Sequence, residues 1–228
     1  MKNIAYNIFI FIILISCKTN KTLIDNNNTS TAVISKEILK NNIETTNDTT
    51  FVNLKDYDKN FVYDMKYATT DNFLKAKVYD CAECFLRLKA VKALVIANNL
   101  FLEKGFKIKL YDCYRPLDIQ KKMFKIVPNP KYVANPAKGS IHNKGGAVDI
   151  SLVDKNGVEV DMGTKFDFFG EEASHKYTNL SKMILKNRIF LKEIMEKANF
   201  KAIEPEWWHY NLIDAQDDKV SNNKWKCD

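Results

Sequence analysis

The segment GSIHNKGGAVDIS, residues 139–151, places a histidine and an aspartate on either side of two adjacent glycines. Its last part, AVDIS, has the apolar character of a buried β-strand but carries an acid at its centre. An ionised carboxylate inside an apolar strand is unfavourable by several kcal/mol unless it is paired or bound to a cation. We therefore expect Asp149 to lie against a cationic partner.

Three histidines occur in the chain: His142, His175 and His209. His142 precedes the two glycines and Asp149 follows them, so the loop and the strand could bring both side chains to one point. In the segment EPEWWHY, Glu206 lies three residues before His209. Two imidazoles and a carboxylate form a three-ligand Zn²⁺ site that leaves one coordination position for water. The alternative is that each histidine is buried and simply hydrogen-bonded.

Hydrolysis at such a site needs further groups. Water on zinc has its pKa lowered toward ~7 and requires a carboxylate to accept its proton. Glu206 is placed to be that base. The developing oxyanion needs a cation or donor, and Arg115, held between a strand end and Pro116, is the candidate. Asp112 either orients Arg115 or ends its strand.

The surrounding pattern predicts the elements that position these residues. We expect helices over 84–104, directly after Pro116, and over 179–199. Strands are expected over 106–114, in GGAVDISLV and in EWWHYNLI, with a hairpin-like turn in DKNGVEV. This mixture predicts an α+β domain with a small, largely antiparallel sheet flanked by helices.

The N-terminus carries a targeting signal. Its apolar run, residues 8–15, is too short for a comfortable membrane span but suits a signal peptide, and LISC resembles a bacterial lipobox that would be acylated at Cys17. An ordinary signal peptide is the alternative. We expect a lipoprotein signal peptide over 1–17, an Asn- and Thr-rich tether over 18–50 and a folded domain over 51–228. The net charge of +7 comes from scattered lysines, which does not favour nucleic-acid binding.

Five segments together resemble the zinc D-alanyl-D-alanine dipeptidases, the group that includes the vancomycin-resistance dipeptidases. They are KYATTDNF, YDCYRP, SIHNKGGAVDIS, DMGTKFDFF and EWWHY, in that order. The resemblance spans roughly 51–214, and S-x-H-x-x-G-x-A-x-D followed by E-x-x-H is a specific pair of motifs.

This resemblance implies one zinc ion per chain, bound by His142, Asp149 and His209. It also implies that Glu206 is the general base and that Arg115 stabilises the tetrahedral intermediate. The implied fold is the α+β zinc-peptidase fold shared with D,D-carboxypeptidases and the hedgehog signalling domain. His175 matches a family Ser-His pair that we interpret as structural.

Two further positions are candidate substrate-binding residues. Asp167 corresponds to an acid near the substrate ammonium, although a turn residue is an equal alternative, and Ser140 could donate to the substrate or satisfy its own loop.

The function implied is hydrolysis of the small dipeptide D-Ala-D-Ala in peptidoglycan turnover, by an enzyme exported to the bacterial cell envelope and lipid-anchored to a membrane. Two alternatives stay open at this point. One is a peptidoglycan D,D-carboxypeptidase or endopeptidase of the same fold, which must admit a longer stem peptide. The other is a non-catalytic binding lipoprotein, although a pure binder would have no need of Glu206.

Besides Cys17, four cysteines remain: Cys81, Cys84, Cys113 and Cys227. An even number fits an oxidising compartment, and four cysteines allow three pairings. We expect a Cys84–Cys113 bridge, because Cys84 opens the predicted helix and Cys113 lies two residues before Arg115. Such a bridge would brace the strand end that aims the arginine, and it leaves Cys81–Cys227 as the second pair.

Overall fold

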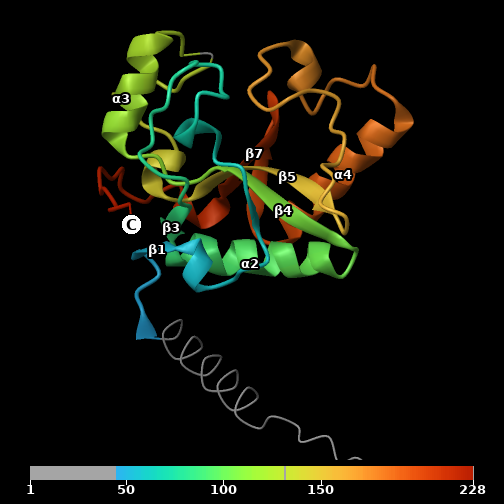
Figure 1. Cartoon of the computed structure of the whole chain (residues 1–228), viewed down its shortest axis with the longest axis horizontal. Helices are drawn as coiled ribbons and strands as arrows, with labels where there is room; N and C mark the ends of the chain where they lie inside the picture. The colour runs from blue at the N-terminus through green and yellow to red at the C-terminus, as the bar shows by residue number, and fades with distance from the viewer. Residues whose placement is uncertain (1–44, 131, 228) are drawn as a thin grey trace, which may run out of the picture. The chain divides into compact units, whose positions relative to one another are not determined.

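The computed structural model describes residues 45–130 and 132–227 (Figure 1). In chain order its strands and helices are β1 (Phe51–Asn53), β2 (Val62–Tyr63), β3 (Phe85–Arg87), α2 (Leu88–Leu102), β4 (Phe106–Asp112), α3 (Leu117–Ile126), β5 (Ala147–Asp154), α4 (Lys182–Lys197), β6 (Phe200–Ile203) and β7 (Glu206–Leu212). Single-turn 3-10 helices connect them: η1 (Leu54–Asp56), η2 (Lys66–Ala68), η3 (His142–Lys144), η4 (Glu171–Ala173) and η5 (Ile213–Ala215).

The main sheet has the strand order β2-β4-β5-β7-β6. Its β2–β4 pair is parallel and the other pairs are antiparallel, which confirms the expected α+β domain with a largely antiparallel sheet. A separate two-stranded sheet joins β1 to β3. Helix α2 runs along β4, and α4 packs against both α2 and β6 (Figure 1).

The central strand β5 has two different faces. Val148, Ile150 and Leu152 belong to the apolar core, which also contains Leu94 of α2 and Leu191 of α4. Side chains alternate between the faces of a strand, so Asp149 is directed to the opposite face. The acid therefore points away from the helix-covered core, toward the loops that follow β4 and precede β5.

The region expected to be one helix, 84–104, is divided. Phe85–Arg87 form β3, and α2 begins at Leu88. The expectation that Cys84 opens the helix is therefore wrong. The reason is a tertiary one, because Phe51 and Arg87 are register partners and β1 supplies hydrogen bonds that a helical turn would otherwise make within itself.

Other boundaries differ by a few residues. The strand expected over 106–114 ends at Asp112, and α4 begins at Lys182 after Ser181, whose hydroxyl accepts a hydrogen bond from the Ile184 N–H. The strands β1, β2 and β6 were not anticipated, since each is four residues or shorter and carries little periodic signal.

Two disulfides, Cys84–Cys113 and Cys81–Cys227, join the pairs expected from the sequence. Disulfides of this kind are typical of exported proteins. The predicted signal peptide, Cys17 and most of the predicted tether lie outside the described residues. Within those described, no helix is long and apolar enough to cross a membrane.

Candidate functional site

Three potential metal ligands converge at the loop-facing side of the sheet. His142, Asp149 and His209 are all buried, and each offers one ligand atom within 4.8 Å of the others. Nε2 of His142 lies 3.2 Å from Nδ1 of His209 and 3.3 Å from Oδ1 of Asp149. Nδ1 of His209 lies 2.9 Å from the same Asp149 oxygen.

Backbone pairing and a tight glycine turn create this convergence. Asp149 of β5 and His209 of β7 are direct cross-strand partners. His142 begins η3, which is followed by Gly145 with a positive φ of 74°. A Cβ at Gly145 would lie 2.3 Å from the ring of Phe51, and one at Gly146 would lie 2.2 Å from the Cβ of Ala215. The two glycines thus allow the loop to enter β5 so close to its neighbours.

The outer nitrogen of each imidazole has its own partner. Nδ1 of His142 lies 2.6 Å from the backbone oxygen of Cys113, and Nε2 of His209 lies 2.8 Å from Oδ1 of Asn211. Since these oxygens accept, the outer nitrogens carry the protons. The inner nitrogens, His142 Nε2 and His209 Nδ1, are left to offer lone pairs toward Asp149.

This donor set fits Zn²⁺. Tetrahedral coordination with Zn–N and Zn–O distances near 2.0–2.1 Å separates ligand atoms by roughly 3.3 Å. The three observed separations, 2.9, 3.2 and 3.3 Å, are close to that edge length. Two lone pairs and a carboxylate that face one another need a cation between them, and the hydrogen-bonded outer nitrogens match the usual support of zinc-binding imidazoles.

In the metal-free protein, a proton on His209 supplies the positive charge that a metal ion would otherwise bring. Burial alone would lower the pKa of His209, but the hydrogen bond and charge of Asp149, helped by Glu206, raise it to about 8. Burial would likewise raise the pKa of Asp149, yet the charges and hydrogen bonds of His142 and His209 hold it well below its usual range. The site therefore favours positive charge at its centre.

Glu206 reaches the same centre from the start of β7. Its Oε2 lies 3.9 Å from Nδ1 of His209, and its side chain is 28% exposed. Burial raises the pKa of Glu206, with a further contribution from Asp149. A half-buried carboxylate of raised pKa beside a metal site is suited to accept and return a proton.

Arg115 lies shortly after the end of β4, and three hydrogen bonds hold its guanidinium in place. Asp112 Oδ2 accepts hydrogen bonds from its Nη2 at 2.6 Å and from its Nε at 3.1 Å, while Gln120 Oε1 accepts from Nη1 at 3.0 Å. The guanidinium also lies 5.4 Å above the ring of Tyr67. Asp112 thus orients Arg115, and the same Oδ2 is 3.9 Å from Nδ1 of His142.

Asp167 and Ser140 have different surroundings. Asp167 has a positive φ of 58° and accepts a hydrogen bond from the Tyr67 hydroxyl at 2.9 Å. Burial, followed by the charge of Asp149, raises the pKa of Asp167 well above its usual range. The Ser140 hydroxyl donates to Asn143 Oδ1 at 3.1 Å, so in the structure it serves its own loop.

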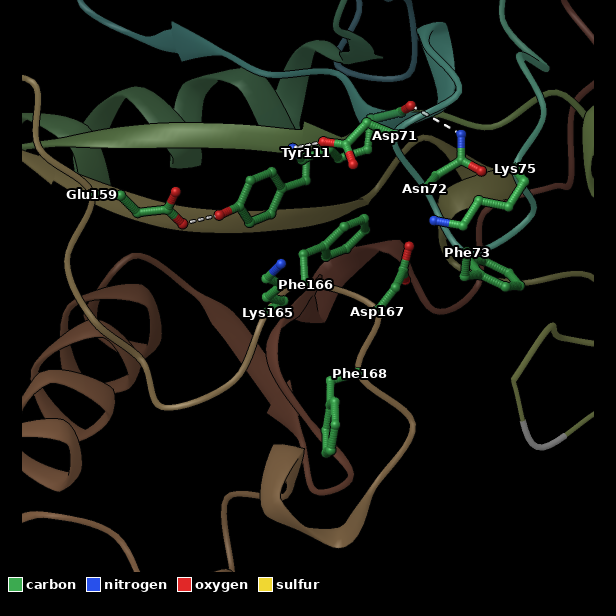
Figure 2. Close-up of a pocket in the computed structure, with 11 residues that line it drawn as sticks. Asp71, Asn72, Phe73, Lys75, Tyr111, Glu159, Lys165, Phe166, Asp167 and Phe168 are labelled. Atoms are coloured by element: carbon green, nitrogen blue, oxygen red, sulfur yellow. Dashed lines mark hydrogen bonds and ion pairs between the residues drawn. The ribbon is translucent and has the colours of Figure 1, made fainter.

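Asp167 also borders a cavity of about 510 Å³, whose walls include Phe73, Phe166, Lys75 and Lys165. Figure 2 shows the Asp167 side chain directed into this space, with Lys75 extending toward it. A second cavity of about 340 Å³ is bordered by Glu206 and Trp208. Phe168 lines both, so the loop over 165–170 runs between the two cavities.

Several residues that support the site were not identified from the sequence. They are Gln120, Tyr67 and Asn211, together with Tyr79, whose hydroxyl donates to Asp112 Oδ1 at 2.7 Å. Of these, only Asn211 had a signal in the sequence, because it is a polar residue two positions after His209. The third histidine, His175, is not part of this cluster.

Comparisons with known proteins identify the family of this chain. A family model described as D-Ala-D-Ala dipeptidase (Peptidase_M15) matches residues 47–226. The chain is 32% identical over 164 residues to the D-alanyl-D-alanine dipeptidase of Escherichia coli K12, which covers 72% of this chain and 85% of that protein. It is 31% identical over 173 residues to the D-alanyl-D-alanine dipeptidase of Enterococcus faecium, covering 67% of this chain and 86% of that one.

Proposed function

The chain belongs to the D-Ala-D-Ala dipeptidase family, and from this premise we propose that it is a zinc dipeptidase that hydrolyses D-alanyl-D-alanine. The observation that carries the proposal is the convergence of three metal-ligand atoms within 4.8 Å of one another, with Glu206 beside them. A non-catalytic binding protein would not require a proton-accepting carboxylate 3.9 Å from a ligand atom.

We propose that His142, Asp149 and His209 hold one Zn²⁺. When bound, the ion supplies Lewis acidity, which lowers the pKa of water and polarises a carbonyl group. Glu206 accepts the proton of the attacking water and delivers it to the leaving amine. Cys113 and Asn211 keep the two imidazoles in the orientation that presents their lone pairs inward.

Arg115 is the proposed oxyanion donor. Its two bonds to Asp112 and one to Gln120 fix the guanidinium before substrate arrives, so little reorganisation is needed as negative charge develops on the scissile carbonyl. The Asp112 carboxylate offsets the positive charge of the buried arginine.

Asp167 is the proposed partner of the substrate's ammonium group. A buried acid whose pKa stays raised despite the charge of Arg115, and that forms no salt bridge among the described side chains, favours a ligand that brings positive charge. The free amino end of a dipeptide supplies it. Ser140 is the proposed donor to the substrate, which requires its hydroxyl to leave Asn143.

The rival activity on longer stem peptides has one observation in its favour. The cavity of about 510 Å³ beside Asp167 offers space beyond the position proposed for the ammonium group. A D,D-carboxypeptidase or endopeptidase would use that space for the peptide on the amino side of the scissile bond.

Product analysis separates the two activities. The zinc-loaded protein is incubated with D-Ala-D-Ala and, separately, with a stem pentapeptide that ends in D-Ala-D-Ala, and free D-Ala is measured. We expect release from the dipeptide alone. Release from the pentapeptide at a comparable rate would show that the amino side is open, and release from neither would refute the proposed chemistry.

We further propose that the protein is a lipoprotein acylated at Cys17, with a tether over 18–50 that carries the domain over 51–228 at the bacterial cell envelope, where it acts in peptidoglycan turnover. Asp48, near the end of this tether, ion-pairs with Lys92 of α2 at 2.7 Å. Membrane fractionation tests the anchor: Cys17→Ala should move the protein to the soluble fraction, whereas an unchanged distribution would exclude acylation at this residue.

A further inference from the structure

In the described part of the chain, six buried polar atoms of side chains have no hydrogen-bond partner, and three of these atoms lie in one region away from the metal centre. They are Nη2 of Arg188 on α4, the hydroxyl of Tyr210 on β7 and Nε2 of His175, which follows η4. Arg188 is 4% exposed and Tyr210 is 0% exposed. Unsatisfied polar atoms are rare in protein interiors, so three together require an explanation.

The three groups are neighbours. The rings of His175 and Tyr210 have centroids 6.5 Å apart, and Arg188 interacts electrostatically with both residues. Tyr210 is the cross-strand partner of Val148, which faces the helix-covered core. This group of residues, here called the Arg188 cluster, therefore lies on the opposite side of the sheet from His209 and Asp149.

Arg188 carries a buried positive charge that has no acid in direct contact with it among the described residues, although the charge of Asp161 raises its pKa. Its Nε donates to the backbone oxygen of Met162 at 2.7 Å, and its Nη1 donates to that of Ser174 at 3.2 Å. Among the residues that the structure describes, no carboxylate oxygen lies within 4.0 Å of the guanidinium. Burial lowers the pKa of Arg188, which reflects the unfavourable environment of the charge.

The free atoms of the cluster can all act as donors. A guanidinium has no acceptor, a tyrosine hydroxyl can donate, and a neutral imidazole can carry its proton at Nε2. Burial, helped by Lys192 and Arg188, lowers the pKa of His175 to about 4, so the imidazole is neutral near pH 7. The cluster thus presents three donors and one full positive charge.

We propose that a monovalent anion of chloride size binds in the Arg188 cluster, between Arg188, Tyr210 and His175. One anion accepts from all three donors and neutralises the guanidinium. A water molecule accepts only two hydrogen bonds and leaves the charge uncompensated. The three residues come from α4, β7 and the segment after η4, so the anion would join these elements. It would lie on the face of β7 opposite to His209.

Thermal unfolding of the zinc-loaded protein tests the proposal. The unfolding midpoint is compared in sodium chloride and in sodium isethionate, whose anion is too large for the cluster, at equal ionic strength. We expect chloride to raise the midpoint by at least ~3 °C in a saturable way. Arg188→Met should abolish the difference, whereas Lys186→Met, which removes the same charge from an exposed position on α4, should preserve it.

A second variant tests the proposal in case Arg188→Met does not fold. Tyr210→Phe keeps the ring and removes only the hydroxyl, so it should weaken the chloride effect. Crystals grown in sodium bromide should show an anomalous peak between the three side chains. Equal midpoints in the two salts, a water without anomalous signal, or a bromide peak with no effect in solution would each overturn the proposal, and none of these readouts depends on dipeptidase activity.

Discussion

Glu206 Oε2 and His209 Nδ1 lie 3.9 Å apart although the residues are three positions apart in a β-strand. In a regular strand, residues separated by three face opposite sides. The pairing of β6 with β7 is irregular here, because Ala202 pairs with Tyr210 whereas the next residue, Ile203, pairs with Glu206. This bulge removes the strict alternation and allows both side chains to reach one centre.

The first prediction concerns the base. Glu206→Gln retains the size of the side chain but cannot accept a proton, so turnover of D-Ala-D-Ala should fall by ~10²–10⁴-fold. Zinc content, measured by atomic absorption, should not change, since the substitution alters no proposed ligand. Glu193→Gln, at an exposed position of α4, is the matched control and should keep full activity. A Glu206→Gln protein with zinc and near wild-type turnover would contradict the assignment.

The second prediction concerns the oxyanion donor. Arg115→Ala should lower kcat by ~10²–10³-fold, with a smaller change in KM, because the lost interaction forms mainly in the transition state. Arg115→Lys keeps the positive charge near Asp112 but cannot form the hydrogen bonds to Asp112 and Gln120 at the same time. Compared with Arg115→Ala, it should therefore recover more of the free energy of unfolding than of kcat. Steady-state kinetics and urea unfolding distinguish these effects. A change in KM alone would point to a substrate-binding role.

The third prediction concerns the metal ligands. His142→Ala and His209→Ala should each lose stoichiometric zinc, whereas His175→Ala, the remaining histidine, should retain it. Asn211→Ala should lower zinc affinity by about 10–100-fold, because it removes the acceptor that orients His209. Competition with a chelating indicator measures these affinities. Full zinc in both ligand variants would refute the site.

The fourth prediction follows from the pKa of about 8 for His209 in the metal-free protein. At pH 7 its imidazole is mostly protonated, so zinc binding should release close to one proton, and the release should fall as the pH rises past about 8. Calorimetry in buffers of different ionisation enthalpy counts these protons. A release that does not change between pH 7 and pH 9 would be inconsistent with this shift.

The same shift predicts how the metal-free protein responds to pH. Because the folded-state pKa of His209 is raised above its unfolded value of 6.5, the stabilisation is fully present below pH 6.5 and is lost as the pH rises through about 8. Chemical denaturation of the chelated protein across this range should show decreasing stability, and His209→Gln should reduce the slope.

The fifth prediction concerns the Cys84–Cys113 bridge. Cys113 is also the residue whose carbonyl oxygen holds His142. The double variant Cys84→Ser and Cys113→Ser should lose ~2–4 kcal/mol of stability and should bind zinc more weakly. The matched removal of Cys81–Cys227 should lower stability while leaving zinc affinity nearly intact. Equal zinc affinity in both double variants would show that the first bridge does not support the site.

The sequence alone determined the features that depend on residue type and local spacing. An acid inside an apolar strand required a cation, and the two glycines before β5 predicted the tight turn that brings His142 back to Asp149. Amphipathic periodicity indicated the long helices, α2 and α4, to within a few residues. These features are local because steric freedom, side-chain alternation and helical periodicity act over a few neighbouring residues.

Only the tertiary structure decided the features that depend on contacts between different elements. Residues 85–87 form a strand because β1 pairs with them. Tyr67 and Gln120 flank Arg115 because folding brings η2 and α3 beside the end of β4. The irregular pairing of β7 places Glu206 and His209 together, whereas spacing alone would separate them on a strand. In each case, hydrogen bonds and packing between different elements outweigh the preference of the residues within one element.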